Sequence, residues 1–444
     1  MPKFRRNLLG AAAGILFVTA SATAQLLPGV GLPSVSLPAP VAAVPVAGPI
    51  LNSVLSQPGA QQLIRPTLDS IGGLPEAVAE SGAPSLLELR RLRLDALIRS
   101  NEAVLDSDSR GEPVRRGILL AVDPDPASLQ QARRAGFRLL ADERDPMLGL
   151  RSVKLEVPQG KSARSALKLL ARVAPGLKAD YDHIYEPSGG SLAPLGAALA
   201  ASAGVGDGRT IGMIDGGVAS HPSLAAASIE QNGFVGDPKP TGHGTAVASL
   251  LVGSQAGFRG AATGARLYVA DVYGGSQAAG SASAIVKALG WLAGHRPQVI
   301  NISLVGPANK LLARAIQIVQ SRGIEVVAAV GNDGPAAPPQ YPASYPGVLA
   351  ITAVDSHGRA LPEAGKAEHL DFAAPGADMA AALPGQGYAR VRGTSFAAPL
   401  AAARLLEAGS AARLAAEARP GKGRVGRGIV CGDCRIDPKS VGAK

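Results

Sequence analysis

The feature that most constrains the fold of this chain is an alternation of short apolar segments with longer helical ones in its second half. The short segments are apolar on both faces, which is typical of strands in a parallel sheet covered by helices on both sides. They are TIGMID (210–215), ARLYVADVY (265–273), QVINISL (298–304), IEVVAAVG (324–331) and VLAITAVD (348–355). Helical segments such as 282–294 and 309–323 lie between them. The pattern predicts a doubly wound α/β domain with a mostly parallel sheet.

A different order of elements precedes it, over residues 115–187. Strand-like and helix-like segments follow one another as β-α-β-β-α-β. They are GILLAV (117–122), PASLQQARRAG (126–136), RLLAD (138–142), SVKLEV (152–157), SARSALKLLARVAP (162–175) and LKADYDHIYE (177–186). This order is the split βαβ arrangement of a small ferredoxin-like domain. The arrangement alone does not indicate a function.

Residues 1–24 have the layout of a secretory signal peptide. A basic start (3–6) precedes an apolar run (8–20), and the small residues at 22–24 follow at the spacing of a cleavage site. We therefore expect a protein that is exported, either secreted or periplasmic, with no stable membrane insertion after cleavage. The alternative is an uncleaved membrane anchor, although the run is shorter than the roughly 20 residues that span a bilayer.

Residues 25–83 are rich in Pro, Ala and Val. Frequent prolines disfavour helices, so this stretch is predicted to be an extended linker, with a tether to a cell wall or partner as the alternative. Ser85 and Glu88 then form a capping-box pattern that begins a helix, assigned to 84–110. Its expected apolar stripe consists of Leu86, Leu89, Leu97 and Ile98.

Half of the net charge of +10 lies in residues 404–444, and residues 1–194 supply most of the rest. Residues 195–403 carry 13 Lys and Arg against 12 Asp and Glu, whereas residues 404–444 carry 9 against 4. A basic patch on the folded domain is therefore not expected, and aromatic residues make up only 3% of the chain. Both observations argue against a nucleic-acid partner. The excess charge of 404–444 is expected to be solvated, with contact to an anionic surface as the alternative.

The only two cysteines, Cys431 and Cys434, lie in a basic tail (431–444). They could form a redox pair, half of a metal site or a local disulfide. A metal site would need two further ligands, and no histidine follows His369. We expect a small structural disulfide, as is usual in exported proteins.

Three polar residues lie at junctions of predicted elements, and each has an ordinary structural interpretation in isolation. Asp215 ends a strand and could cap its own turn. His243 lies between two glycines before a small-residue helix, and Ser395 lies where a helix begins and could cap it. Together, Asp, His and Ser in this order match one of the known orders of the acyl-transfer triad.

Four motifs then resemble the subtilisin-like serine peptidases, the subtilases, over roughly residues 195–430. They are IGMIDGGVASHPSL (211–224), TGHGTAVASLLVG (241–253), AAVGNDG (328–334) and RGTSFAAPLAAA (392–403). The resemblance implies a subtilisin-like catalytic domain and a serine endopeptidase that hydrolyses peptide bonds of polypeptide substrates through an acyl-enzyme. We expect a monomer that needs no cofactor. The alternative is a catalytically silent subtilase fold that acts as a binding protein.

The resemblance also implies a role for each residue. Ser395 would be the nucleophile, His243 the base that takes and returns its proton, and Asp215 the group that orients the imidazole. Asn332 would donate to the oxyanion. The strand and loop of Ser303, Leu304, Val305 and Gly306 should form one wall of the substrate cleft and bind an extended peptide by β-augmentation.

Two further expectations follow from the resemblance. Ser223 stands where many subtilases have a calcium-binding aspartate, so no metal site is predicted here. Subtilases are often made with a small propeptide domain of ferredoxin-like fold, which suggests that residues 25 to about 190 are a propeptide, cut within 186–200. A permanent N-terminal domain is the alternative.

Overall fold

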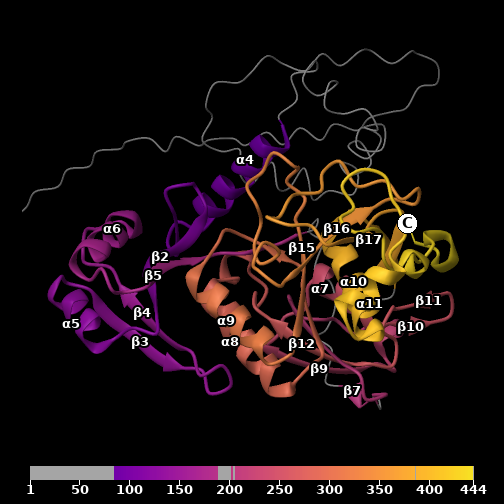
Figure 1. Cartoon of the computed structure of the whole chain (residues 1–444), viewed down its shortest axis with the longest axis horizontal. Coiled ribbons are helices and arrows are strands. Elements are labelled where there is room, and N and C mark those ends of the chain that lie inside the picture. The colour runs from indigo at the N-terminus through magenta and orange to yellow at the C-terminus, as the bar shows by residue number, and fades with distance from the viewer. Residues whose placement is uncertain (1–84, 189–201, 204–205, 386, 444) are drawn as a thin grey trace, which may run out of the picture. The chain divides into compact units, whose positions relative to one another are not determined.

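The computed structural model describes residues 85–188, 202–203, 206–385 and 387–443 (Figure 1). The chain divides into two compact units, Met1–Ala47 and Gly48–Lys444, and every described residue belongs to the second. The predicted signal peptide and linker, and most of the stretch predicted to contain the maturation cut, lie outside the described residues.

An eight-stranded sheet forms the centre of the C-terminal domain. In spatial order its strands are β17 (Phe372–Pro375), β16 (Leu349–Val354), β15 (Glu325–Ala329), β13 (Val299–Ile302), β8 (Thr210–Asp215), β12 (Arg266–Asp271), β9 (Ser228–Gly233) and β7 (Ser202–Ala203). All neighbours pair in parallel except β7 and β9. Strands β9 and β12 lie on one side of β8 and β13 to β17 on the other, so the winding reverses at β8. Ligand sites of such sheets lie at this point, beyond the carboxyl ends of the strands.

Helices cover both faces of this sheet. They are α7 (Gly242–Val252), α8 (Ala282–His295), α9 (Lys310–Ser321), α10 (Thr394–Ala408) and α11 (Ala411–Glu417). Met213 of β8 belongs to the buried cluster that contains residues of α7 and α10, whereas the next residue, Ile214, belongs to the cluster of α8 and α9. Successive strand residues point to opposite faces. The two clusters therefore confirm the doubly wound α/β fold.

The ferredoxin-like domain consists of β2 (Pro113–Val122), α5 (Pro126–Arg134), β3 (Arg138–Arg144), β4 (Arg151–Glu156), α6 (Ala163–Val173) and β5 (Ala179–His183). Its antiparallel strands lie in the order β3-β4-β2-β5, which is the spatial order of the split βαβ fold. One face of the sheet and the two helices enclose a separate apolar core that includes Leu119, Leu155 and Leu170.

The helix predicted for 84–110 is shorter than expected. Helix α4 spans Leu86–Ser100, and the Ser85–Glu88 capping box is present. The chain then forms β1 (Leu105–Ser107), which pairs with β2 and fully buries Leu105. The expected apolar stripe is also wrong in part. Leu86 and Leu89 are 38% and 44% exposed, while α4 buries Arg90 and Leu94.

The C-terminal tail packs on the domain that contains the large sheet. Cys431 and Cys434 form the expected disulfide, and Ile436 is buried in the same cluster as α7 and α10. Lys439 and most other basic side chains of 404–443 are exposed, as predicted, but their backbone is part of the domain.

The remaining elements are short. They are β6 (Glu186–Pro187), β10 (Ser254–Gln255), β11 (Phe258–Arg259), β14 (Leu304–Val305), β18 (Met379–Leu383), β19 (Gly387–Val391), η1 (Pro222–Leu224), η2 (Gln277–Ala279), η3 (Gly432–Cys434) and η4 (Pro438–Val441).

Candidate active site

Asp215 ends β8 at the point where the winding of the sheet reverses. Its side chain is buried, and its Oδ1 accepts a hydrogen bond from Gly216 N at 2.7 Å. A Cβ on Gly216 would overlap the side chain of Thr241, the residue that caps α7. The space that a larger residue at 216 would need is therefore filled by the loop that carries the histidine.

His243 lies in the first turn of α7. Thr241 Oγ1 accepts from Gly244 N at 2.9 Å and fixes the start of this helix. His243 Nδ1 donates to the Asp215 carboxylate, at 3.0 Å from Oδ1 and 2.9 Å from Oδ2. A proton on Nδ1 leaves the other ring nitrogen, Nε2, as the basic one.

Ser395 is the second residue of α10, whose N-cap is Gly393. Its Oγ and His243 Nε2 are both buried, and neither has a hydrogen-bond partner among the described residues. The ring of Phe396, the next residue, lies 5.3 Å from the His243 ring. The two atoms expected to exchange a proton are thus free of competing partners, and catalytic hydrogen bonds often form only in the substrate complex.

Asn332 follows β15 and faces the start of α10. Its Oδ1 accepts from Thr394 N at 3.0 Å, which fixes the orientation of the amide. Its Nδ2 donates to the carbonyl oxygen of Ser188, a residue just after the ferredoxin-like domain. The Asn332 side chain therefore already binds a peptide carbonyl.

The segment around Ser188 lies along the predicted cleft wall. Strand β6 pairs antiparallel with β14, with Leu304 opposite Pro187 and Val305 opposite Glu186. Ser188 N donates to Ser303 O at 3.0 Å, which extends this pairing toward Asn332. The chain's own segment therefore occupies the wall in the manner expected of a bound peptide.

Tyr185, the residue before β6, holds the start of the same segment in place. Its backbone N donates to Gly280 O at 2.7 Å, and its hydroxyl donates to Pro307 O at 2.7 Å. The ring is fully buried against Gly306, where a Cβ would lie 2.6 Å from a ring carbon. Gly306 therefore makes room for a large side chain beside the cleft.

Ser303 was expected on the cleft wall, but its contact with the start of α10 and the place of Asp271 beside Asp215 were not recognised from the sequence. Ser303 Oγ donates to Ser395 O at 2.9 Å, and Asn301 Nδ2 donates to Ser303 Oγ at 3.0 Å, so a buried polar chain supports the start of α10. Asp271 lies beside Asp215 in the sheet, accepts from Lys239 N at 2.8 Å, and has its pKa raised by burial. No motif marks these contacts, because they depend on pairing between distant strands.

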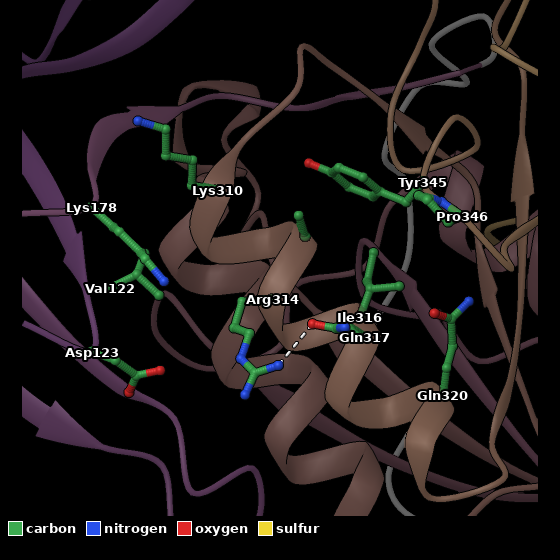
Figure 2. A pocket seen from close by; sticks show the side chains of 11 residues that line it. Val122, Asp123, Lys178, Lys310, Arg314, Ile316, Gln317, Gln320, Tyr345 and Pro346 are labelled. Atoms are coloured by element: carbon green, nitrogen blue, oxygen red, sulfur yellow. Dashed lines mark hydrogen bonds between the residues drawn. The ribbon is translucent and has the colours of Figure 1, made fainter.

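The ferredoxin-like domain contacts the N-termini of α8 and α9 through two carboxylates of β5. Asp182 accepts from Ser283 N at 2.9 Å and from Ser283 Oγ at 2.8 Å. Asp180 accepts from Lys310 N at 2.9 Å. A cavity of about 390 Å³ lies between this domain and α9. Residues such as Lys178 and Arg314 line it (Figure 2). None of the residues proposed for catalysis lines it.

The described part of the chain has neither a metal-binding cluster nor a membrane-spanning helix. Within residues 85–188, 206–385 and 387–443, no group of three His, Cys, Asp or Glu side chains is arranged to hold a metal ion. No helix in that part is long and apolar enough to span a bilayer.

Comparisons with known proteins agree with this geometry. The model of the subtilase family matches residues 206–417. Subtilisin Savinase of Lederbergia lenta is 35% identical over 201 residues, which make up 44% of this chain and 73% of that protein. An alkaline protease of Alkalihalobacillus alcalophilus is also 35% identical over 201 residues, 44% of this chain and 52% of the relative.

One solved structure is similar over a longer range. Fervidolysin from Fervidobacterium pennivorans, described as a keratinolytic enzyme related to subtilisin, matches with a TM-score of 0.58 at 20% identity. The match covers 72% of this chain and 61% of that one. At this identity the likeness concerns the fold alone.

Proposed function

Since this chain belongs to the subtilase family of serine-type endopeptidases, we propose that it hydrolyses peptide bonds through an acyl-enzyme on Ser395. The observation that carries the proposal is the joint placement of Asp215, His243 and Asn332. The first two are hydrogen-bonded as an acid–base pair requires, and the third binds the carbonyl oxygen of Ser188.

The proposed reaction begins with attack of Ser395 Oγ on the substrate carbonyl carbon. His243 Nε2 takes the hydroxyl proton, while the Asp215 carboxylate stabilises the imidazolium. The negative charge on the carbonyl oxygen is stabilised by Asn332 Nδ2 and by the N–H of Ser395 at the positive end of α10. His243 then protonates the leaving amine, the C–N bond breaks, and water hydrolyses the ester by the same proton transfers in reverse.

The first substrate in this proposal is the chain itself. The Ser188 carbonyl lies at Asn332 and the preceding residues pair with β14, which supports cleavage between Ser188 and Gly189. Residues up to Ser188, here called the pro-segment, would then be a propeptide rather than a permanent domain. Export by the predicted signal peptide belongs to the same proposal.

Active-site labelling tests both parts. The purified chain and its Ser395→Ala variant are treated with a fluorophosphonate probe, and intact masses are measured in parallel. We expect label only in the wild type, on a form that begins at Gly189. Label on the full-length chain would overturn the propeptide part. No label, even after the pro-segment has been removed by another protease, would indicate a silent subtilase fold that acts as a binding protein.

A further inference from the structure

Helix α4 lies against the loop that carries Asn332. Three consecutive residues of this loop, Asn332, Asp333 and Gly334, each contact the pro-segment. The first binds the Ser188 carbonyl, whereas the other two contact α4. The pro-segment thus meets the same loop from two elements that are about 90 residues apart in the sequence.

Arg90 forms the buried part of this contact. Its Nε donates to Asp333 Oδ2 at 3.1 Å, and its Nη2 donates to both carboxylate oxygens of Glu112, at 2.9 and 2.8 Å. All three side chains are at most 8% exposed. Because Glu112 belongs to the pro-segment, Arg90 links that segment to the loop of the catalytic domain.

Arg93, one turn further along α4, forms the more exposed part of the contact between α4 and the loop. It donates to both oxygens of Asp333, at 3.0 and 3.2 Å, and to Glu186 Oε2 at 3.4 Å. Glu186 is in β6, the strand that lies on the cleft wall. Half of the Arg93 side chain is exposed, so its ion pairs are more screened than those of Arg90.

The start of α4 completes the contact. A Cβ on Gly334 would lie 2.9 Å from Leu86 Cδ1, so a glycine is needed for the helix to approach this closely. Gly334 also has a φ of +79°, a conformation that side-chain-bearing residues rarely adopt.

We propose that α4 is a second binding element of the pro-segment, and that the surface it recognises is the carboxylate of Asp333 beside the oxyanion amide. This inference rests on the proposed function. Once the Ser188–Gly189 bond is cut, noncovalent contacts alone hold the pro-segment over the cleft. Its release would leave Asp333 without the two guanidinium groups that now cover it. Helix α4 therefore delays release and keeps the cleaved enzyme inhibited.

Because both arginines lie in the pro-segment, they can be changed without altering the sequence of the mature domain. Full-length chains with Arg90→Gln, Arg93→Gln or Arg93→Glu are allowed to cleave themselves, and each cleaved complex is isolated. All variants yield the same mature domain, so its intrinsic activity is unchanged. After dilution, hydrolysis of a fluorogenic peptide gives the rate of release, and intact mass shows how much pro-segment survives. Arg91→Gln, an exposed position on the same helix, is the matched control.

We expect Arg93→Gln to speed release by about 3- to 5-fold, as suits a half-exposed pair. Arg93→Glu should release faster still, because it places a third carboxylate beside Asp333 and Glu186. Arg90→Gln should release at least about 30-fold faster, because it leaves the buried Glu112 carboxylate without its guanidinium partner and the buried Asp333 carboxylate with Arg93 alone. Circular dichroism of the cleaved complexes checks that α4 remains helical.

The outcomes separate the inference from the function on which it rests. If the wild type labels with fluorophosphonate but both Arg93 variants release at the rate of Arg91→Gln, the inference alone is overturned. If the wild type neither cleaves itself nor labels, the proposed function fails and the inference fails with it.

Discussion

The side-chain amide of Asn332 has one orientation available, because Thr394 N donates to its Oδ1. Its N–H group is therefore held in place before any charge develops on a substrate, which is the condition for strong transition-state stabilisation. We expect Asn332→Ala to lower kcat by about 100- to 1,000-fold, the range known for the corresponding side chain of a subtilisin, with little change in KM.

Steady-state hydrolysis of a peptide by the mature enzyme measures this effect. Asn232→Ala removes an exposed amide from β9 and should leave kcat unchanged. A loss below about threefold for Asn332→Ala would contradict the oxyanion role.

Asp108 is a buried carboxylate whose environment favours its charged form. Burial alone would raise its pKa, but the His183 ring, whose Nε2 lies 3.5 Å from Asp108 Oδ2, and hydrogen bonds from the backbone N–H groups of Glu112 and Arg110 hold the pKa at about 2. The pKa in the folded chain is lower than the roughly 3.9 of an unfolded chain. The stabilisation is therefore present above about pH 4 and is lost as the pH falls toward 2.

Hydrogen exchange of the β1 and β2 amides in the uncleaved Ser395→Ala chain measures this loss. Lowering the pH from 5 to 3 should reduce the free energy of protection in both chains, after correction for the intrinsic exchange rate. The reduction should be about 1 kcal/mol smaller in the Asp108→Asn variant, which lacks the titrating carboxylate. Equal losses with and without the carboxylate would contradict the assignment.

At the scale of elements, backbone N–H groups at the N-termini of two helices of the catalytic domain donate hydrogen bonds to carboxylates of the pro-segment. The positive ends of α8 and α9 face Asp182 and Asp180. Asp182 is 2% exposed, so its removal leaves the buried N–H and hydroxyl of Ser283 without this acceptor. We expect Asp182→Ala to destabilise the uncleaved Ser395→Ala chain by about 2 kcal/mol.

Thermal unfolding of that chain checks the effect. Asp180→Ala removes the half-buried neighbour and serves as the comparison, with an expected cost of about 0.5–1 kcal/mol. If Asp182→Ala costs no more than Asp180→Ala, the buried cap does not contribute as proposed.

At the scale of the whole molecule, the C-terminal tail completes the catalytic domain. Ile436 is buried in the main core, and its carbonyl oxygen accepts from Ala380 N at 3.0 Å. Arg435 donates to the carbonyl oxygens of Ala377 and Asp355. We expect Ile436→Ala to lower the stability of the domain by about 2–4 kcal/mol, because a cavity opens in a packed core.

Denaturant unfolding of the mature domain measures this cost. Lys439→Ala changes an exposed residue of the same tail and should stay within about 0.5 kcal/mol of the wild type. Equal midpoints for the two variants would mean that the tail does not contribute to the core.

The local pattern of apolar and polar residues was sufficient to predict most of the fold. The five segments predicted as strands of the large sheet, from 210–215 to 348–355, all contain strands of that sheet, and the six elements of the ferredoxin-like domain follow the predicted order. Three sheet strands, β7, β9 and β17, were not recognised, and β7 has only two residues. Strand β9 is partly polar, and β17 has only four residues, so neither has a clear period.

The types of the candidate site residues and their order in the chain also limited the reactions that the site could be expected to catalyse. Asp215, His243 and Ser395 suggested a triad because each stands at a junction where an α/β sheet presents functional groups. Their mutual geometry was not available from spacing, since it depends on parallel pairing of β8 and β12 and on where α7 and α10 begin.

The sequence by itself therefore determined the alternation of strands and helices, the identity of the reactive groups and the family resemblance, because these depend on neighbouring residues and short motifs. Only the tertiary structure decided that Ser188 lies at Asn332, that α4 buries Arg90 rather than Leu86, and that the tail belongs to the core. Each of these depends on at least one partner more than 50 residues away, such as Asp333 for Arg90 or Ala380 for Ile436. Burial of a charged side chain is stable only beside such a partner, so helical periodicity alone selected the wrong face.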